Sequence, residues 1–205
     1  MKFYNSIGPN PRVVTMFMAE KGIDIPQVTI DLRGGENRRA PYSTEVNIAG
    51  QTPALELDDG SFLCEITAIC EYLEEIFPGT PLIGTTPEAR ANTRMWARRV
   101  DIKICEPLTN GFRYSEGLPL FQPRMRCLPE AAEGLKAIAQ DGVAWLDPLI
   151  ADREFVAGDT LSLADLMLFA FLDFGVSVGQ PIDPAFTHVV SWYERMKSRP
   201  SANPN

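Results

Sequence analysis

The sequence predicts an α/β domain followed by an all-helical domain. Strand and helix signals alternate through the first third of the chain, whereas the apolar patterns after it have a helical period. The two regions are separated by "PGTPLIGTTPE", which holds three prolines and two glycines in eleven residues and is typical of a linker. We therefore expect residues 1–77 to form the first domain, residues 78–87 the linker and residues 88–205 the helical domain.

The first domain opens with a strand, a helix and a second strand. The short apolar stretch "KFYN" predicts the first strand, and "QVTID" predicts the second. Between them, "PRVVTMFMAEKG" predicts a helix with Asn10 as its N-cap, Pro11 at its first position and Gly22 at its end. Because a helix joins the two strands, we expect them to be parallel.

The rest of this domain is less regular at first. The polar stretch "ENRRAPYSTEVN" is interrupted by Pro41 and predicts an irregular helix. Two short strands, "ALEL" and "SFL", are joined by the turn Asp58-Asp59-Gly60 and predict an antiparallel hairpin. A helix over residues 65–77 follows, with one apolar stripe formed by Ile66, Ile69, Cys70 and Leu73. Together these elements predict a small mixed sheet covered by helices.

Four helical regions are predicted after the linker: at least residues 87–106, then 129–150, 162–174 and 184–199. The third is strongly apolar and is predicted to be the core helix of the domain. Ser162, with Asp165 three residues later, predicts an N-cap pair at its start, which we assign to stability rather than chemistry. Residues 200–205 are polar and are expected to fray.

The charge of the chain excludes some partners. With 19 basic and 27 acidic residues, the net charge of −8 argues against nucleic acid and against an anionic membrane surface. No apolar run approaches the roughly 20 residues of a membrane span, and the start lacks the apolar core of a signal peptide. We therefore expect a cytoplasmic protein with neither a nucleic-acid nor a membrane partner.

The cysteines and the histidine do not predict a metal site. Cys64, Cys70, Cys105 and Cys127 form no Cys-x-x-Cys pair, and His188 is the single histidine. The cysteines therefore give little support to a redox motif or a zinc site, a structural role is the first expectation for His188, and no metal is predicted.

Four segments in order resemble the glutathione transferase family, and they span nearly the whole chain. They are "FYNSIGPNPRVVTMFMAEKGI", "GQTPALELDDG", "LCEITAICEYLEE" and "VAGDTLSLADLMLFA". The segment "GQTPALELDDG" is similar to the family's cis-proline segment, "LCEITAICEYLEE" to the Glu-Ser start of a helix, and "VAGDTLSLADLMLFA" to its capping box. The resemblance implies a thioredoxin-like first domain, a helical-bundle second domain and glutathione as co-substrate.

The resemblance also implies a glutathione site. If Pro53 is cis, the Thr52 backbone faces the ligand and pairs with its cysteinyl part as a strand would; an ordinary strand start is the alternative. Glu65 would hold the γ-glutamyl ammonium group and the Ile66 N–H its carboxylate, although Glu65 can instead merely complement the helix dipole. The full set of implied glutathione-binding residues is Asn37, Arg38, Gln51, Thr52, Pro53, Glu65 and Ile66.

Ile66 departs from the family pattern. It stands where Ser or Thr is usual, so one hydroxyl contact is lost while the backbone contact remains. Losing one hydrogen bond weakens glutathione binding by about 1 kcal/mol. Arg38 can equally be a solvated cation rather than a ligand residue.

The reaction requires a thiolate. Lowering the thiol pKa by two units takes about 2.7 kcal/mol, whereas a helix N-terminus supplies roughly 0.3–1 kcal/mol and a hydrogen bond to a charged group about 1.5–3 kcal/mol. The site therefore needs at least one donor. The loop "YNSIGPNP" lacks the cysteine that some family members use, and Tyr4 lies in the predicted strand. Ser6 and Asn10 are the candidate catalytic residues, with a plain N-cap as the alternative for Asn10.

This opening resembles a bacterial and fungal subgroup that lacks the standard Tyr, Ser or Cys, in which groups of the helical domain assist the thiol. The corresponding stretch here is "CEPLTNGFRYSEGLP". The candidate substrate-pocket residues are Ile7, Thr109, Asn110, Phe112, Arg113 and Tyr114. This mixture is apolar with one cation, which suits a small hydrophobic electrophile, with or without an anionic group; the aromatic residues can equally be core.

The resulting hypothesis is a homodimeric glutathione transferase, with a role in detoxification, that attacks an electrophile with the glutathione thiolate. A glutathione-dependent lyase or peroxidase would use the same site, and a glutathione-binding or interaction module without chemistry is the non-enzymatic alternative. The missing Tyr/Ser/Cys and Ile66 favour that alternative, whereas Glu65 and Thr52-Pro53 argue against it.

Overall fold

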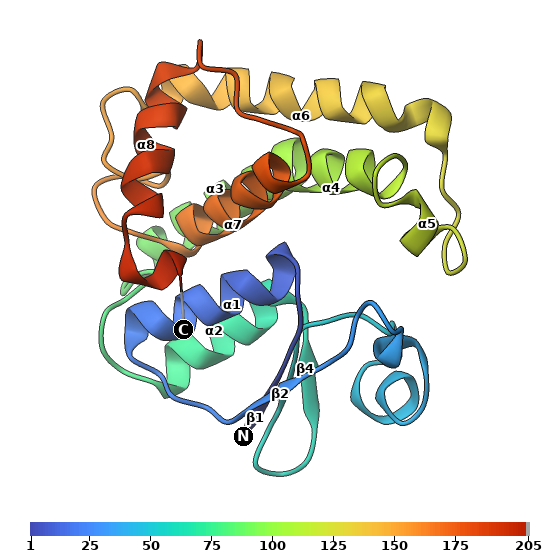
Figure 1. Cartoon of the computed structure of the whole chain (residues 1–205). Helices are drawn as coiled ribbons and strands as arrows, with labels where there is room; N and C mark the ends of the chain where they lie inside the picture. Colours follow the sequence, from blue (N-terminus) through green and yellow to red (C-terminus); the bar gives the residue numbers. More distant parts are fainter. Residues whose placement is uncertain (204–205) are drawn as a thin grey trace. The chain divides into compact units, whose positions relative to one another are not determined.

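The computed structural model describes residues 1–203 of the chain. The chain divides into two compact units (Figure 1): the first holds Met1–Leu82 together with Asn203, and the second holds Ile83–Ala202. The first contains a sheet and helices and the second is helical, so the expected fold class, an α/β domain plus an all-α domain, is confirmed. Pro204 and Asn205, which belong to the predicted helical domain, lie outside the described residues.

A four-stranded sheet with the strand order β2-β1-β3-β4 forms the base of the first unit. Its strands are β1 (Lys2–Asn5), β2 (Gln27–Thr29), β3 (Ala54–Glu56) and β4 (Phe62–Cys64). β1 and β2 are parallel, whereas β3 is antiparallel to both β1 and β4. The predicted parallel pair and the predicted hairpin are therefore both confirmed.

Helices α1 (Pro9–Lys21) and α2 (Ile66–Ile76) lie on the same side of this sheet in Figure 1. Phe3 and Leu55 are cross-strand partners and so share one face of the sheet. Both are fully buried, as are Phe17 of α1 and Ile69 of α2. Burying side chains of this size contributes roughly 1.5–3 kcal/mol each, so this layer is the core of the unit.

The segment between β2 and β3 is irregular, as predicted. It forms a 3₁₀ turn, η1 (Glu36–Arg38), and a π-helical turn, η2 (Tyr42–Val46). The Ala40–Pro41 peptide bond between them is cis. The interruption expected from Pro41 is therefore confirmed, because no single helix runs through the segment.

A buried ion pair binds the segment that follows α2 to the first unit. Lys21 Nζ lies 2.9 Å from Glu74 Oε2, with only 2% and 7% of the two side chains exposed. Lys21 also donates to the Thr80 carbonyl oxygen, and Glu74 Oε1 accepts a hydrogen bond from the Leu82 N–H. These contacts hold the Pro/Gly-rich stretch to the first unit as far as Leu82.

The second unit contains α3 (Pro87–Val100), α4 (Glu106–Arg113), α5 (Leu118–Phe121), α6 (Ala132–Leu146), α7 (Leu163–Ser177) and α8 (Thr187–Lys197). Shorter 3₁₀ turns occur at η4 (Pro129–Ala131), η5 (Asp147–Ile150) and η6 (Pro200–Ala202). The mostly buried α7 packs against α3, α4 and α8, which confirms it as the core helix. The four-residue α5 was not predicted because so short an element has no detectable period.

The first long helix continues past residue 106. Between α3 and α4 lies a π-helical turn, η3 (Asp101–Cys105), whose hydrogen bonds span one residue more than those of an α-helix. Pro107 follows this turn and has no N–H to give to the Lys103 carbonyl oxygen. That oxygen lies so close to α6 that a Cβ at Gly142 would be 2.3 Å away, so this crossing requires a glycine.

The start of α7 carries the predicted Ser162–Asp165 capping box. Asp165 is fully buried, and its Oδ2 accepts from the Ser162 N–H at 3.0 Å and the Ser162 hydroxyl at 2.8 Å. Its Oδ1 accepts from the Val156 N–H at 2.8 Å and from Trp192 Nε1 at 3.0 Å. Burial raises the pKa of Asp165, and these four hydrogen bonds oppose that shift.

Two further expectations concern the ends of elements and membranes. The expectation that the C-terminal residues fray is wrong for residues 200–202, because they form η6 and Ser201 and Ala202 are buried. Residues 204 and 205 lie outside the described part. Among the helices of residues 1–203, none combines the length and the apolar character that a bilayer crossing requires.

Candidate functional site

Three segments that carry predicted ligand residues meet at one end of the sheet in the first unit. Tyr4 of β1 pairs with Ala54 of β3, and Ala54 pairs with Cys64 of β4. Because β3 is antiparallel to both neighbours, the end of β1, the start of β3 and the end of β4 lie side by side. Ser6 and Glu65 directly follow β1 and β4, and Thr52 lies just before the start of β3, so the three residues lie at the same edge of the sheet.

Ser6 is tied to Thr52 through their hydroxyls. Ser6 Oγ lies 2.5 Å from Thr52 Oγ1 and 3.2 Å from the Ile7 carbonyl oxygen, and the Ser6 N–H donates to Asn5 Oδ1. Each hydroxyl has one proton, and the Ser6–Thr52 bond uses only one of the two. Unless Ser6 donates over the longer distance to Ile7, the pair keeps one proton for a ligand.

Asn10 is not the N-cap of α1, which corrects the sequence-based expectation. The N-cap is Gly8, with a φ of 120°, and the helix begins at Pro9. Such a φ strongly favours glycine, and the fixed φ of proline suits the first helical position, so the chain enters the helix two residues earlier than predicted. Within residues 1–203 the side-chain amide of Asn10 makes no hydrogen bond, so it is not used for capping.

The N-terminus of α1 is poor in backbone donors. The N–H groups without an intrahelical partner belong to the N-cap and the first three helical residues. Here these are Gly8, Pro9, Asn10 and Pro11, and the two prolines have no N–H. An anion at this helix end therefore depends more on side-chain donors than it would at an ordinary helix N-terminus.

The Thr52–Pro53 peptide bond is cis. The residue before it is anchored, because the Gln51 carbonyl oxygen accepts from the Tyr42 hydroxyl at 2.7 Å and from Asn47 Nδ2 at 2.9 Å. In the part of the chain that the structure describes, the Thr52 N–H and C=O make no hydrogen bond to protein. This leaves a short backbone edge with the donor and acceptor of an unpaired strand.

Glu65 has a strained backbone. Its φ of 73° and ψ of 131° make it the only non-glycine residue with a positive φ in residues 1–203. Strain of this kind costs roughly 1–3 kcal/mol and is concentrated at functional sites. Glu65 is also the N-cap of α2 and is exposed, but its side chain makes no capping bond. Ile66 begins the helix, so its N–H and the positive end of the dipole remain available.

Asn37 and Arg38 differ in accessibility. Asn37 is 1% exposed, and its Nδ2 donates to the Gly50 carbonyl oxygen at 2.6 Å. This bond fixes the loop before Gln51, and a contact between Asn37 and a ligand stays a prediction. Arg38 is exposed and donates to the Ala49 carbonyl oxygen at 3.2 Å.

The predicted pocket residues of the second unit lie on and just after α4, and Thr109 is the most buried of them. It is 6% exposed, and its hydroxyl donates within the helix, to the Cys105 carbonyl oxygen at 2.6 Å with the Glu106 carbonyl oxygen at 3.1 Å. Asn110 accepts from Arg113 and donates to Glu106. Phe112, Arg113 and Tyr114 are partly exposed, and Ile7 of the first unit is 55% exposed.

The cysteines are free thiols. Cys70 and Cys105 are buried, and burial raises the pKa of each thiol, as it does for the half-buried Cys64. No group of three or more His, Cys, Asp or Glu side chains in residues 1–203 is arranged to hold a metal ion.

Two features were missed by sequence reasoning. The Thr52 hydroxyl was overlooked because only the backbone of this residue was considered; a hydroxyl residue before a predicted cis-proline, on the strand beside β1, was the available signal. Arg124, whose guanidinium lies 4.3 Å from the centre of the Phe121 ring, was overlooked because it follows the unpredicted helix α5.

Family models match both units of the chain. The model of the glutathione S-transferase N-terminal domain matches residues 7–76, and the model of the C-terminal domain matches residues 118–200. Glutathione S-transferase 2 of Saccharomyces cerevisiae is 32% identical over 199 residues, which cover 95% of this chain and 84% of the relative. The chain belongs to the glutathione S-transferase family.

Two further relatives match most or all of the chain. A crystal structure of a glutathione S-transferase domain-containing protein from Marinobacter aquaeolei is 33% identical, with a TM-score of 0.93, and the match covers 99% of this chain and 100% of that one. The maleylacetoacetate isomerase of Pseudomonas aeruginosa is 32% identical over 170 residues, covering 80% of this chain and 78% of the relative. The thioredoxin-like first domain expected from the sequence is thereby confirmed, and the family supports glutathione-dependent activity in general.

Proposed function

We propose that this chain is a glutathione transferase that ionises the thiol of glutathione for attack on a small hydrophobic electrophile. The observation that carries the proposal is the Ser6–Thr52 hydroxyl pair, 2.5 Å apart, beside the open backbone edge of Thr52. Family membership supports glutathione as the ligand of this edge.

In the proposed complex the cysteinyl part of glutathione pairs with the Thr52 N–H and C=O as an added strand. The exposed Glu65 carboxylate binds the γ-glutamyl ammonium group, and the Ile66 N–H binds the neighbouring carboxylate at the positive end of α2. The glycine carboxylate is assigned to Arg38 and Gln51. The strained backbone of Glu65 supports this assignment, because a strained residue is retained where its geometry serves a site.

The thiolate requires a side-chain donor. The first turn of α1 offers few backbone donors, since Pro9 and Pro11 have none. When Ser6 donates to Thr52 rather than to the Ile7 carbonyl oxygen, the Thr52 hydroxyl keeps its proton for the sulfur. Hydrogen bonds in a chain strengthen one another, so the Thr52 hydroxyl is then a better donor than a lone hydroxyl. A hydrogen bond of about 1.5–3 kcal/mol to the sulfur lowers the thiol pKa by roughly one to two units. The unused amide of Asn10 is the second candidate donor.

The experiment is an ultraviolet difference titration of bound glutathione thiolate against pH. The variants are Ser6→Ala, Thr52→Val, the double variant and Asn10→Ala, with Thr52→Ser as the control that keeps the hydroxyl. We expect each hydroxyl deletion to raise the thiol pKa by one to two units, and the double variant to add little to the larger single effect. Thr52→Ser should behave as the wild type.

Three outcomes would count against parts of the proposal. A shift that only Asn10→Ala removes would make Asn10 the donor instead of the pair. Binding without a lowered thiol pKa would favour the non-catalytic module. Absence of binding would refute the site itself.

The relative named maleylacetoacetate isomerase supports glutathione-dependent isomerisation as a second candidate. Measuring free glutathione separates the chemistries. Conjugation consumes one glutathione for each substrate, peroxide reduction consumes two and yields the disulfide, and isomerisation leaves the amount unchanged.

A further inference from the structure

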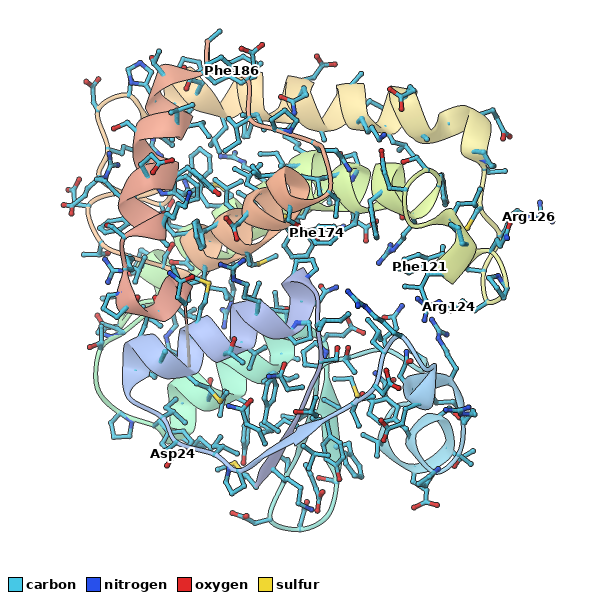
Figure 2. The ribbon with its side chains drawn as sticks, in the orientation of Figure 1. Asp24, Phe121, Arg124, Arg126, Phe174 and Phe186 are labelled. Atoms are coloured by element: carbon cyan, nitrogen blue, oxygen red, sulfur yellow. The ribbon has the colours of Figure 1, made fainter. Side chains whose placement is uncertain are left out.

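The carbonyl oxygen of Gln51 is held by two side-chain donors from the irregular segment between β2 and β3. The Tyr42 hydroxyl donates to this oxygen at 2.7 Å and Asn47 Nδ2 at 2.9 Å. Tyr42 begins η2 and Asn47 directly follows it, and Figure 2 shows side chains in the space between this segment and the sheet. Because a carbonyl oxygen has two lone pairs, both of its acceptor sites are occupied.

The two donors are themselves fixed. Asn47 is 7% exposed, its Oδ1 accepts from the Ala49 N–H at 2.9 Å, and its own N–H donates to the Tyr42 carbonyl oxygen. Since the Ala49 N–H can only donate, this bond decides which end of the Asn47 amide is the oxygen. Tyr42 is 3% exposed, and its ring meets the Tyr4 ring edge to face with centres 6.2 Å apart. Burial raises the pKa of Tyr42, so its hydroxyl keeps its proton where a thiol ionises.

Holding this oxygen also sets the direction of the Thr52 N–H. The Gln51 carbonyl and the Thr52 N–H belong to one planar trans peptide unit, in which the oxygen and the hydrogen point in opposite directions. With the oxygen drawn toward Tyr42 and Asn47, the hydrogen is directed away from them, and within residues 1–203 it has no acceptor. The two bonds to the oxygen also polarise the peptide unit, which makes its N–H a stronger donor.

We infer that Tyr42 and Asn47 are positioning residues for glutathione, which aim the Thr52 N–H at the cysteinyl carbonyl of the ligand and strengthen that bond. This inference rests on the proposed function, in which the backbone of Thr52 pairs with glutathione. Neither side chain has to touch the ligand, because each acts through the peptide unit that it holds. The competing explanation is that the two residues hold the loop of residues 47–51 for stability alone.

The test uses a glutathione analogue in which a methyl group replaces the thiol, so that recognition of the peptide is measured without ionisation of sulfur. Calorimetric titration of the analogue into the wild type, Tyr42→Phe, Asn47→Ala and the double variant gives the affinity per folded molecule. Tyr4→Phe is the matched control. It removes a tyrosine hydroxyl from the same pair of rings, but that hydroxyl donates to Glu56 at 2.8 Å, away from the Gln51 carbonyl.

We expect Tyr42→Phe to weaken binding of the analogue by about 2- to 10-fold, which corresponds to the loss of one hydrogen bond. Asn47→Ala should weaken it at least as much, because the Ala49 N–H also loses its acceptor. The double variant should lose more than the product of the single losses, since either donor alone still holds the oxygen. Tyr4→Phe should bind like the wild type. A Tyr42→Phe variant that loses stability but no affinity would overturn the inference.

The amide resonance of Thr52 gives a signature that a purely stabilising role would not produce. In isotope-labelled protein, we expect the Thr52 amide proton to resonate further downfield in the wild type than in Tyr42→Phe, because its peptide unit is more polarised. Binding of the analogue should move it further downfield, and by less in the variant. The same resonance in both proteins, or no response to the bound analogue, would contradict the inference.

The titration of bound glutathione thiolate separates this inference from the transferase proposal. If binding of the analogue depends on Tyr42 and Asn47 but the thiol pKa is not lowered, the transferase proposal fails and the positioning role stands. If the thiol pKa is lowered and neither variant alters the affinity or the Thr52 resonance, the positioning role fails and the transferase proposal stands. An analogue that does not bind the wild type would refute both.

Discussion

Replacing Asp165 should destabilise the helical unit while leaving glutathione binding intact. In Asp165→Ala, the N–H groups of Val156 and Ser162 and the indole N–H of Trp192 all lose their buried acceptor. The Ser162 hydroxyl can rotate, but these three donors cannot. Each buried donor left without a partner costs roughly 1–3 kcal/mol, so three cost about 3–9 kcal/mol before relaxation.

Removing the carboxylate also removes the cost of burying it, which works in the opposite direction, as the raised pKa of Asp165 indicates. We therefore expect a loss of about 3–5 kcal/mol in the free energy of unfolding. Asp165→Asn should lose almost as much. Asn keeps the shape and one acceptor, but its NH₂ group then faces either the Ser162 N–H or the Val156 and Trp192 donors.

Urea unfolding followed by tryptophan fluorescence measures this effect. The three tryptophans, Trp96, Trp145 and Trp192, all lie in the helical unit, so the signal reports on that unit. Glutathione affinity, measured per folded molecule, should match the wild type. Asp165→Asn within about 0.5 kcal/mol of the wild type would refute the four-bond account, and a loss of affinity without destabilisation would refute the purely structural assignment.

Three further predictions follow from buried or strained groups. Burial raises the pKa of Asp165 above its unfolded value of about 3.9. The stabilisation that comes from this shift is fully present below the unfolded pKa and is lost as the pH rises through the folded pKa. The difference in unfolding free energy between the wild type and Asp165→Asn should therefore widen on acidification from neutral pH. Lys21→Met leaves the Glu74 carboxylate buried without its ammonium partner and should lower the free energy of unfolding by about 3–5 kcal/mol. Unfolding followed by circular dichroism measures this loss, and part of the stability should return when Glu74 is also changed to Met. Glu65→Gly should raise the thermal midpoint by relieving roughly 1–3 kcal/mol of strain while abolishing glutathione binding, whereas Glu65→Ala should abolish binding without the stability gain.

Each of these has a result that would contradict it. A pH-independent gap would show that Asp165 has the same pKa in both states. A Lys21→Met variant as stable as the wild type would mean that the pair is not buried in solution. Equal stabilities of the Gly and Ala variants at position 65 would remove the argument from backbone strain.

The sequence predicted local features well and non-local ones poorly. The Ser162–Asp165 spacing predicted the capping box, but the bonds from Val156 and Trp192 depend on packing between elements and have no local signal. The Ser6–Thr52 pair joins residues 46 apart through strand pairing. The N-cap was misplaced because "IGPNP" presents the same signal twice, Gly8-Pro9 and Asn10-Pro11, and only the backbone conformation at Gly8 separates them.

The π-helical turn at Asp101–Cys105 acts as a phase shift within one long helix. A residue in an α-helix advances the side-chain direction by about 100°, so the extra residue of the turn rotates everything after it by about that amount relative to an uninterrupted helix. The direction in which the side chains of α4 point is therefore not fixed by the direction in which those of α3 point. Deleting one residue from this turn would keep the helix but rotate Phe112 relative to α7, so the edge-to-face contact of Phe112 with Phe174 depends on a single surplus residue about two turns upstream.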